Sequence, residues 1–135
     1  MNRRTFLAVS VAAAYTLSAG IVYAGSYLDR AALMLEEGRK EIETVKTRTN
    51  DKELLIVVRA LTEARLKVAR KMNVPAQVVS AHPHLMLVLE NYDRAIESLL
   101  ASNTKKYAEC LVNAADEEKT FRSMIKEAGY SLPKL

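Results

Sequence analysis

The residue types best suited to chemistry in this chain gather in one short stretch, "AHPH". His82 and His84 flank Pro83 and are the only histidines, and Met86 follows two residues later. Two imidazoles at this spacing can share a metal ion in an extended segment, and Met86 lies one turn from His82 if a helix begins there. Nitrogen and thioether ligands favour copper. In the simpler interpretation, His82 is a helix cap, His84 is solvated and Met86 fills the core.

The short motifs that mark most catalytic and metal sites are missing from the sequence. It has no Glu-x-x-His pair for a carboxylate di-iron site, no Cys-x-x-Cys-His for haem attachment and no His-Glu-x-x-His for zinc. It also has no glycine-rich phosphate loop and no histidine beside a plausible nucleophile. The sequence therefore predicts a protein that is not an enzyme.

The first 24 residues have the layout of a leader that delivers the protein. Arg3 and Arg4 form a basic start, residues 6–22 carry no charge, and "VYA" places small residues near a possible cut before Gly25. These three parts are typical of a secretory signal peptide. We therefore expect residues 1–24 to be a cleaved leader, residues 25–135 to be the mature domain, and the product to be periplasmic or secreted.

The order "NRRTFL" at residues 2–7 resembles the twin-arginine export signal, in which two arginines precede a variable residue, a bulky apolar residue and leucine. The resemblance implies export of an already folded chain, a route most common for cargo that carries a cofactor. The alternative is an uncleaved membrane anchor over residues 5–23, because the apolar run approaches the roughly 17 to 25 residues that span a bilayer. Its alanines and hydroxyl side chains make the run weakly hydrophobic, which favours cleavage.

The mature chain would hold 111 residues, enough for one domain with a modest core. Loss of Arg3 and Arg4 lowers the formal net charge from +4 to +2, and no stretch joins clustered basic residues to aromatic ones. We therefore expect no nucleic-acid partner.

Cys110 is the only cysteine, which excludes a disulfide within the chain. A small buried side chain is its expected role, and a disulfide between two copies is the alternative.

Apolar residues recur at helical spacing along the mature chain, and no stretch alternates with the period of a strand. The spacing predicts helices at about 27–48, 50–72, 83–102 and 104–128. Two short turns and one longer link would join them, which is typical of an up-down-up-down four-helix bundle. The predicted fold is therefore all-α.

Capping residues indicate where these helices begin and end. Asn50 in "NDKE" predicts a capping box for the second helix, and Pro75 favours one helical turn inside the longer link. Asn103 or Thr104 would start the last helix, and Gly129 would end it.

Each predicted helix has an apolar stripe that we assign to the core. The first stripe repeats every seven residues and holds Leu28, Ala31, Leu35, Gly38, Ile42 and Val45. The second holds Leu54, Val57, Val58, Leu61, Ala64, Val68 and Met72. The third holds Leu85, Val88, Leu89, Tyr92, Ile96, Leu99 and Leu100. The fourth holds Tyr107, Leu111, Ala114, Phe121, Ile125 and Ala128.

Length, export and helix order resemble the soluble b-type cytochromes of the periplasm, which hold haem between a methionine on the first helix and a histidine on the last. Met34 in "DRAALMLEE" matches the first ligand in position. The last helix has no histidine, so Met124 would have to supply the second ligand in a bis-methionine arrangement. In the simpler interpretation both methionines fill the core. Gly38 either admits a bulky neighbour such as Phe121 or leaves space for a flat ligand.

The leading interpretation is a small exported bundle that acts as a binding or interaction module with a protein partner, for example as an accessory subunit of a periplasmic or membrane complex. The alternative is a haem or copper carrier for electron transfer or metal handling. A membrane would be involved only through an uncleaved leader. The fourth stripe is rich in alanine and the mature chain has one phenylalanine, so a homodimer would add buried area to a thin core.

Overall fold

The computed structural model consists of helices joined by short links. It describes the backbone from residue 3 and the side chains from residue 25, and residues 3–135 contain no strand. The leader prediction for residues 1–24 therefore lies outside the residues whose side chains are described.

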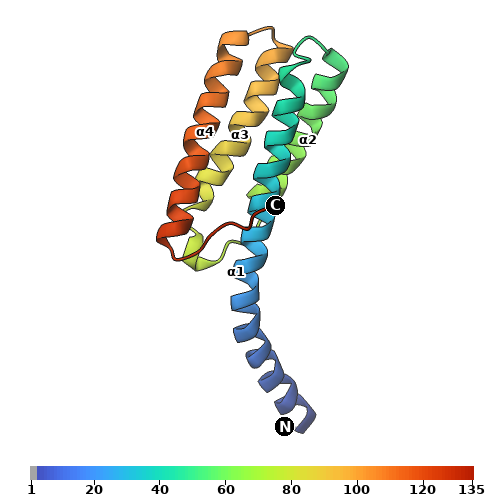
Figure 1. Ribbon diagram of the computed structural model, residues 1–135. Coiled ribbons are helices and arrows are strands. Elements are labelled where there is room, and N and C mark those ends of the chain that lie inside the picture. The colour runs from blue at the N-terminus through green and yellow to red at the C-terminus, as the bar shows by residue number, and fades with distance from the viewer. Residues whose placement is uncertain (1–2) are drawn as a thin grey trace.

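Four α-helices alternate in direction along a common axis (Figure 1). They are α1 (Arg3–Lys46), α2 (Lys52–Arg70), α3 (His82–Leu100) and α4 (Thr104–Glu127). The 3₁₀ helix η1 (Ala76–Val78) lies in the link between α2 and α3 and confirms the turn predicted after Pro75. The all-α four-helix bundle predicted from periodicity is confirmed. Within the described residues, none of the helices has the length and apolar character needed to cross a membrane.

Helix α3 is the centre of the bundle because it packs against each of the other three helices. Its buried residues come from every turn and are Leu85, Val88, Leu89, Asn91, Tyr92, Ala95, Ile96, Ser98 and Leu99. The stripe predicted for this helix is confirmed, with Leu100 packed at the margin of the core. All six residues of the stripe predicted for the first helix are buried as well. The apolar spacing of α1 and α3 therefore identifies their inward faces correctly.

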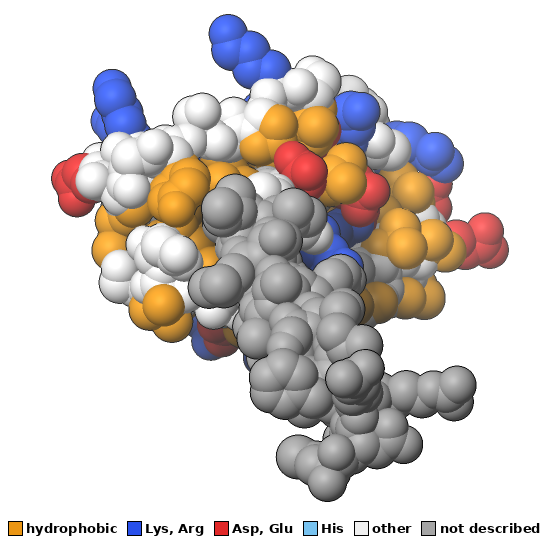
Figure 2. Space-filling model, turned by 90° about the horizontal axis from the view of Figure 1, so that it is seen from below, with side chains coloured by type: hydrophobic (Ala, Val, Ile, Leu, Met, Phe, Trp, Pro, Cys, Tyr) orange, Lys and Arg blue, Asp and Glu red, His pale blue; other side chains and the backbone are white. Residues whose placement is uncertain are grey.

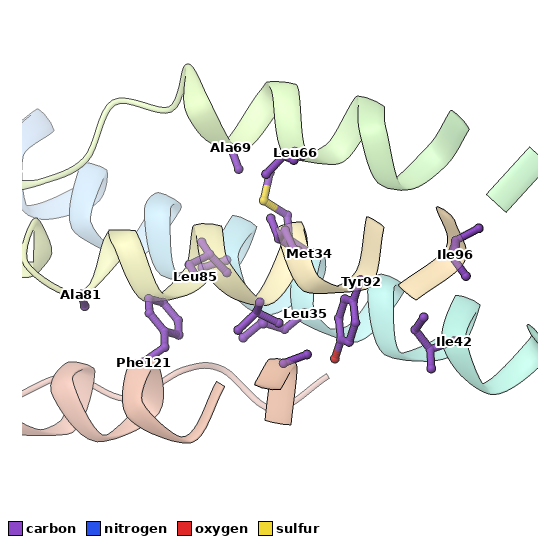
Figure 3. Packing of buried hydrophobic residues seen from close by; sticks show 14 of the residues in the cluster. Met34, Leu35, Ile42, Leu66, Ala69, Ala81, Leu85, Tyr92, Ile96 and Phe121 are labelled. Atoms are coloured by element: carbon purple, nitrogen blue, oxygen red, sulfur yellow. The ribbon is translucent and has the colours of Figure 1, made fainter. Parts of the chain in front are cut away.

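Helix α4 presents small side chains to α3 at its N-terminal half and large ones further along. Cys110 and Ala114 are buried near its start, and Phe121 and Ile125 are buried near its end. Phe121 projects from α4 toward Leu85 of α3 (Figure 3). The prediction that Cys110 is a small buried side chain is confirmed, whereas Ala128, the C-cap of α4, is exposed and was wrongly assigned to the core.

The helix ends follow ordinary capping chemistry with one correction to the sequence reading. The N-cap of α2 is Asp51 and not Asn50, because the extended backbone of Asp51 lets its carboxylate accept a hydrogen bond of 3.1 Å from the Leu54 amide. Asn103 caps α4 as predicted, through a 3.0 Å hydrogen bond from the Lys106 amide. Gly129 follows α4 with a φ of +89°, a left-handed conformation that favours glycine.

Helix α2 buries a different face from the one predicted. Its buried residues are Leu55, Val58, Thr62, Leu66 and Ala69. Of the predicted stripe, Val58 belongs to this set, and Leu54 and Met72 pack against the margin of the core. The other four are exposed, namely Val57, Leu61, Ala64 and Val68. The physical reason is that α2 has apolar residues on two faces, and periodicity alone does not say which face meets the other helices.

Gly38 on α1 admits the ring of Tyr92 from α3. A Cβ atom added at Gly38 would lie 2.8 Å from Cδ2 and 2.9 Å from Cε2 of Tyr92, closer than real carbon contacts allow. The bulky neighbour is thus Tyr92 and not Phe121, the residue expected from the sequence. The ring of Tyr92, which is 8 % exposed, fills the space that a side chain at position 38 would occupy.

Gly38→Ala should lower the free energy of unfolding by up to about 2 kcal/mol, because the overpacking cost of about 1–3 kcal/mol exceeds the gain of about 1 kcal/mol in helix propensity. In a Tyr92→Ala background the same substitution should instead stabilise the protein by about 1 kcal/mol, since the ring is gone. Urea denaturation of the four variants measures both differences. An effect of the same sign in both backgrounds would contradict this account of Gly38.

Candidate functional site

His82 is held between three helices at the start of α3. The Tyr27 hydroxyl of α1 lies 2.8 Å from Nδ1, and the carbonyl oxygen of Ala69 in the last turn of α2 lies 3.0 Å from Nε2. A carbonyl can only accept, so Nε2 carries a proton and donates to Ala69, while Nδ1 of the neutral ring accepts from Tyr27. The ring thereby ties α1, α2 and α3 together, and its hydrogen bond adds to the backbone hydrogen bond that the Ala69 carbonyl accepts from the Met72 amide.

Burial lowers the pKa of His82, and the hydrogen bond to the Ala69 carbonyl opposes part of that effect. Loss of solvent disfavours the charged imidazolium, so the neutral ring is the form that the folded protein prefers. Both ring nitrogens already have hydrogen-bond partners. A metal ion at His82 would have to displace Tyr27 or Ala69.

The other two residues of the copper prediction take separate roles. Nδ1 of His84 lies 2.6 Å from a carboxylate oxygen of Glu117 on α4, at a half-buried position. Met86 is half-buried and packs against the core cluster. His82 thus joins α3 to α1 and α2, whereas His84 joins α3 to α4. No group of three or more His, Cys, Asp or Glu side chains with metal-binding geometry occurs within residues 25–135.

The two methionines of the haem prediction both belong to the packed interior. Met34 is buried and its side chain lies beside Leu66 of α2 (Figure 3). Met124 is half-buried and packs against the same core cluster from α4. Their surroundings match the gap-filling role that methionine commonly has in cores.

An open groove of about 270 Å³ runs between α1 and α4, with the Tyr92 ring in its wall. Ile42 and Leu111 give it an apolar floor, and charged side chains that include Glu43 and Glu118 form its rim. Burial, and to a lesser degree the Glu118 carboxylate, raises the pKa of Tyr92 to about 12, so its hydroxyl stays protonated at neutral pH. The floor of the groove is therefore uncharged, and its charged groups lie on the rim.

Two polar contacts determine which way α2 faces. Arg65, whose side chain is 10 % exposed, makes a bidentate pair with Glu41 of α1, one bond of which measures 3.1 Å. Thr62 belongs to the buried face of α2, and its hydroxyl lies 2.8 Å from a carboxylate oxygen of Asp93 on α3. Burial raises the pKa of Asp93, and the hydrogen bond from Thr62 opposes this. These contacts hold the Leu55 face of α2 against the core.

A second apolar row lies on another side of α2. None of its side chains is buried against the other described helices. We call Val57, Leu61, Ala64 and Val68 the outer face of α2. They are spaced four, three and four residues apart, and Val57, Leu61 and Val68 are 58 %, 47 % and 56 % exposed. At the end of the bundle that Figure 2 shows from below, apolar side chains reach the surface among charged ones. The outer face is the strongest candidate for a functional surface among the described residues.

Sequence reasoning found the residues of the outer face but assigned them to the core. The signal that could have separated the two faces is the placement of Thr62 and Arg65. A polar residue inside a stripe is compatible with burial if another helix supplies its partner, and that partner is visible only in three dimensions. Reasoning from sequence also missed Tyr27 as the partner of His82, because 55 residues separate them.

Comparison with protein-family models, curated proteins and solved structures finds no match to this chain.

Acid should destabilise the fold through His82. Because the pKa of His82 is lower in the folded chain than the ordinary value of 6.5, the unfolded chain takes up the proton first as the pH falls. The free energy of unfolding should therefore be fully retained above pH 6.5 and decline below it. Urea denaturation at intervals from pH 7.5 to 5 measures this dependence.

His82→Gln should flatten this dependence, and His84→Gln is the matched control that should retain the loss in acid. A wild-type stability that does not change between pH 7.5 and 5, or a His82→Gln variant with the wild-type slope, would contradict the assignment.

Proposed function

We propose that this protein is an exported, non-catalytic helical bundle that acts as a binding module, and that the outer face of α2 is its binding surface. The observation that carries the proposal is the row formed by Val57, Leu61, Ala64 and Val68 on a helix whose other face is already buried. Single exposed apolar residues are ordinary, whereas an aligned row marks an interaction site.

The polar contacts of α2 support this role because they keep the outer face turned to solvent. Arg65 pairs with Glu41 of α1, and Thr62, within the buried face, pairs with Asp93 of α3. Rotation of α2 that buried Leu61 would break both contacts and take the hydroxyl of Thr62 away from the partly buried Asp93 carboxylate, which is costly. The fold therefore keeps the apolar row exposed, although contact of these side chains with water is unfavourable.

Export is supported by the sequence of the leader. Arg3 and Arg4, the uncharged run and "VYA" have the order of a signal peptide, and "NRRTFL" resembles a twin-arginine signal. The periplasm or the exterior is then the proposed location of the mature domain, which begins at Gly25. Tyr27 follows closely and anchors the first helix to His82, so the domain keeps its packing after a cut at this point.

Haem and copper binding are less well supported than a protein interaction. His82 already uses both ring nitrogens, and His84 pairs with Glu117. Met34 and Met124 pack among apolar side chains. The interaction role is therefore the proposal.

Expression of the full chain with its own leader in a bacterial host tests the export part. We expect the periplasmic fraction to yield a chain whose intact mass starts at Gly25. Replacement of Arg3 and Arg4 by lysine should abolish export if the twin-arginine route is used, because that route requires the arginine pair. A leaderless chain that starts at Gly25 is the control and should stay in the cytoplasm. Retention of the complete chain in the cytoplasm would overturn the export proposal.

A further inference from the structure

We infer that the outer face of α2 binds the same face of a second copy of this chain, with the two α2 helices antiparallel about a two-fold axis. The inference rests on the proposed binding role and deepens it by naming the partner. A two-fold interface must be complementary to itself, since the same patch is used twice. The outer face must therefore be able to pack against its own image.

The spacing of the outer face matches the seam of a coiled coil. Val57, Leu61, Ala64 and Val68 occupy alternate a and d positions of a heptad repeat, the positions at which side chains of one helix enter the gaps of another. In an antiparallel pair centred between Leu61 and Ala64, each leucine faces the partner's alanine. Val57 then faces the partner's Val68. Large side chains meet small ones, which allows close packing.

The charges at the two ends of α2 favour this antiparallel arrangement. Glu53 is exposed in the first turn, and Lys67 and Lys71 are exposed at the other end of the helix. In the antiparallel pair, Glu53 of each copy lies near Lys71 of the other. A parallel pair would instead place Glu53 against Glu53 and lysine against lysine. Opposed helix dipoles favour the antiparallel pair in the same direction.

The border of the outer face carries charges of both signs. Glu53, Lys67 and Lys71 are exposed on α2, and Arg65 pairs with Glu41 and Glu37 of α1. A second copy supplies groups of both signs to this border, whereas an anionic lipid surface would pair only with the basic ones.

Sedimentation velocity of the purified protein, made from its complete sequence, tests the inference. We expect a concentration-dependent dimer, and Leu61→Glu should raise the dimer dissociation constant at least tenfold. The matched control is Val112→Glu, which changes an equally apolar, 61 % exposed residue on α4 and should leave the dimer intact. Far-UV circular dichroism shows whether both variants stay helical. A wild-type protein that is monomeric at several hundred micromolar overturns the inference.

Charge reversal tests the direction of pairing. Glu53→Lys should weaken the dimer because it places lysine near the partner's Lys71, and the double variant Glu53→Lys with Lys71→Glu should restore it. If the double variant is as weak as the single one, the antiparallel arrangement is wrong.

Engineered disulfides provide an independent geometric test in a Cys110→Ala background. Val57→Cys together with Val68→Cys should give a covalent dimer under mild oxidation, whereas Val57→Cys alone should not, because two copies of residue 57 lie far apart in the antiparallel pair. Efficient cross-linking of the single variant would indicate parallel pairing and overturn the inference.

Failure of the inference can be told apart from failure of the proposed function. If the wild-type protein is monomeric but binds a different protein, and Leu61→Glu abolishes that binding, the second copy is ruled out as the partner and the binding role of the outer face stands. If Leu61→Glu changes neither self-association nor binding of any other protein, both are overturned.

Discussion

Helix α2 is apolar on two faces, and a helix at the outside of a bundle can bury only one of them. Which face is buried decides both the composition of the core and the character of the surface. Leu55, Val58 and Leu66 enter the core, so Leu61 and Val68 remain in solvent. The hydrophobic effect alone does not distinguish strongly between these two choices, because each row would remove similar side chains from water. Specific polar contacts make the choice.

The polar contacts join α2 to α1, to α3 and, at its end, to His82. Arg65 reaches Glu41 on α1, and Thr62 reaches Asp93 on α3. The Ala69 carbonyl at the end of α2 accepts from His82, so a shift along the helix axis is opposed as well. Partly buried pairs of this kind contribute modestly to net stability but are costly to break, and they therefore specify one arrangement among several that bury equal apolar area.

Much of the fold could be predicted from the sequence because α1 and α3 each have a single apolar stripe. The inward positions of Leu35, Gly38 and Tyr92 followed from spacing alone. The face of α2 could not be predicted in this way, since its two rows have the same period and only contacts from other helices separate them. The roles of His82 and Tyr92 depend likewise on Tyr27 and Gly38, which are distant in sequence. The apolar row of the candidate surface could thus be recognised in the sequence, but its exposure to solvent could not be predicted.

Thiol reactivity at position 64 shows whether the outer face of α2 is turned to solvent and then covered by a second copy. The reaction rate would be measured against protein concentration in an Ala64→Cys, Cys110→Ala chain. Ala64 is exposed on the outer face of α2, so the cysteine should react rapidly in dilute solution and become protected as concentration rises and the faces pair. Protection at every concentration would mean that α2 buries this face in its own core. Rapid reaction at every concentration would mean that no second copy covers it.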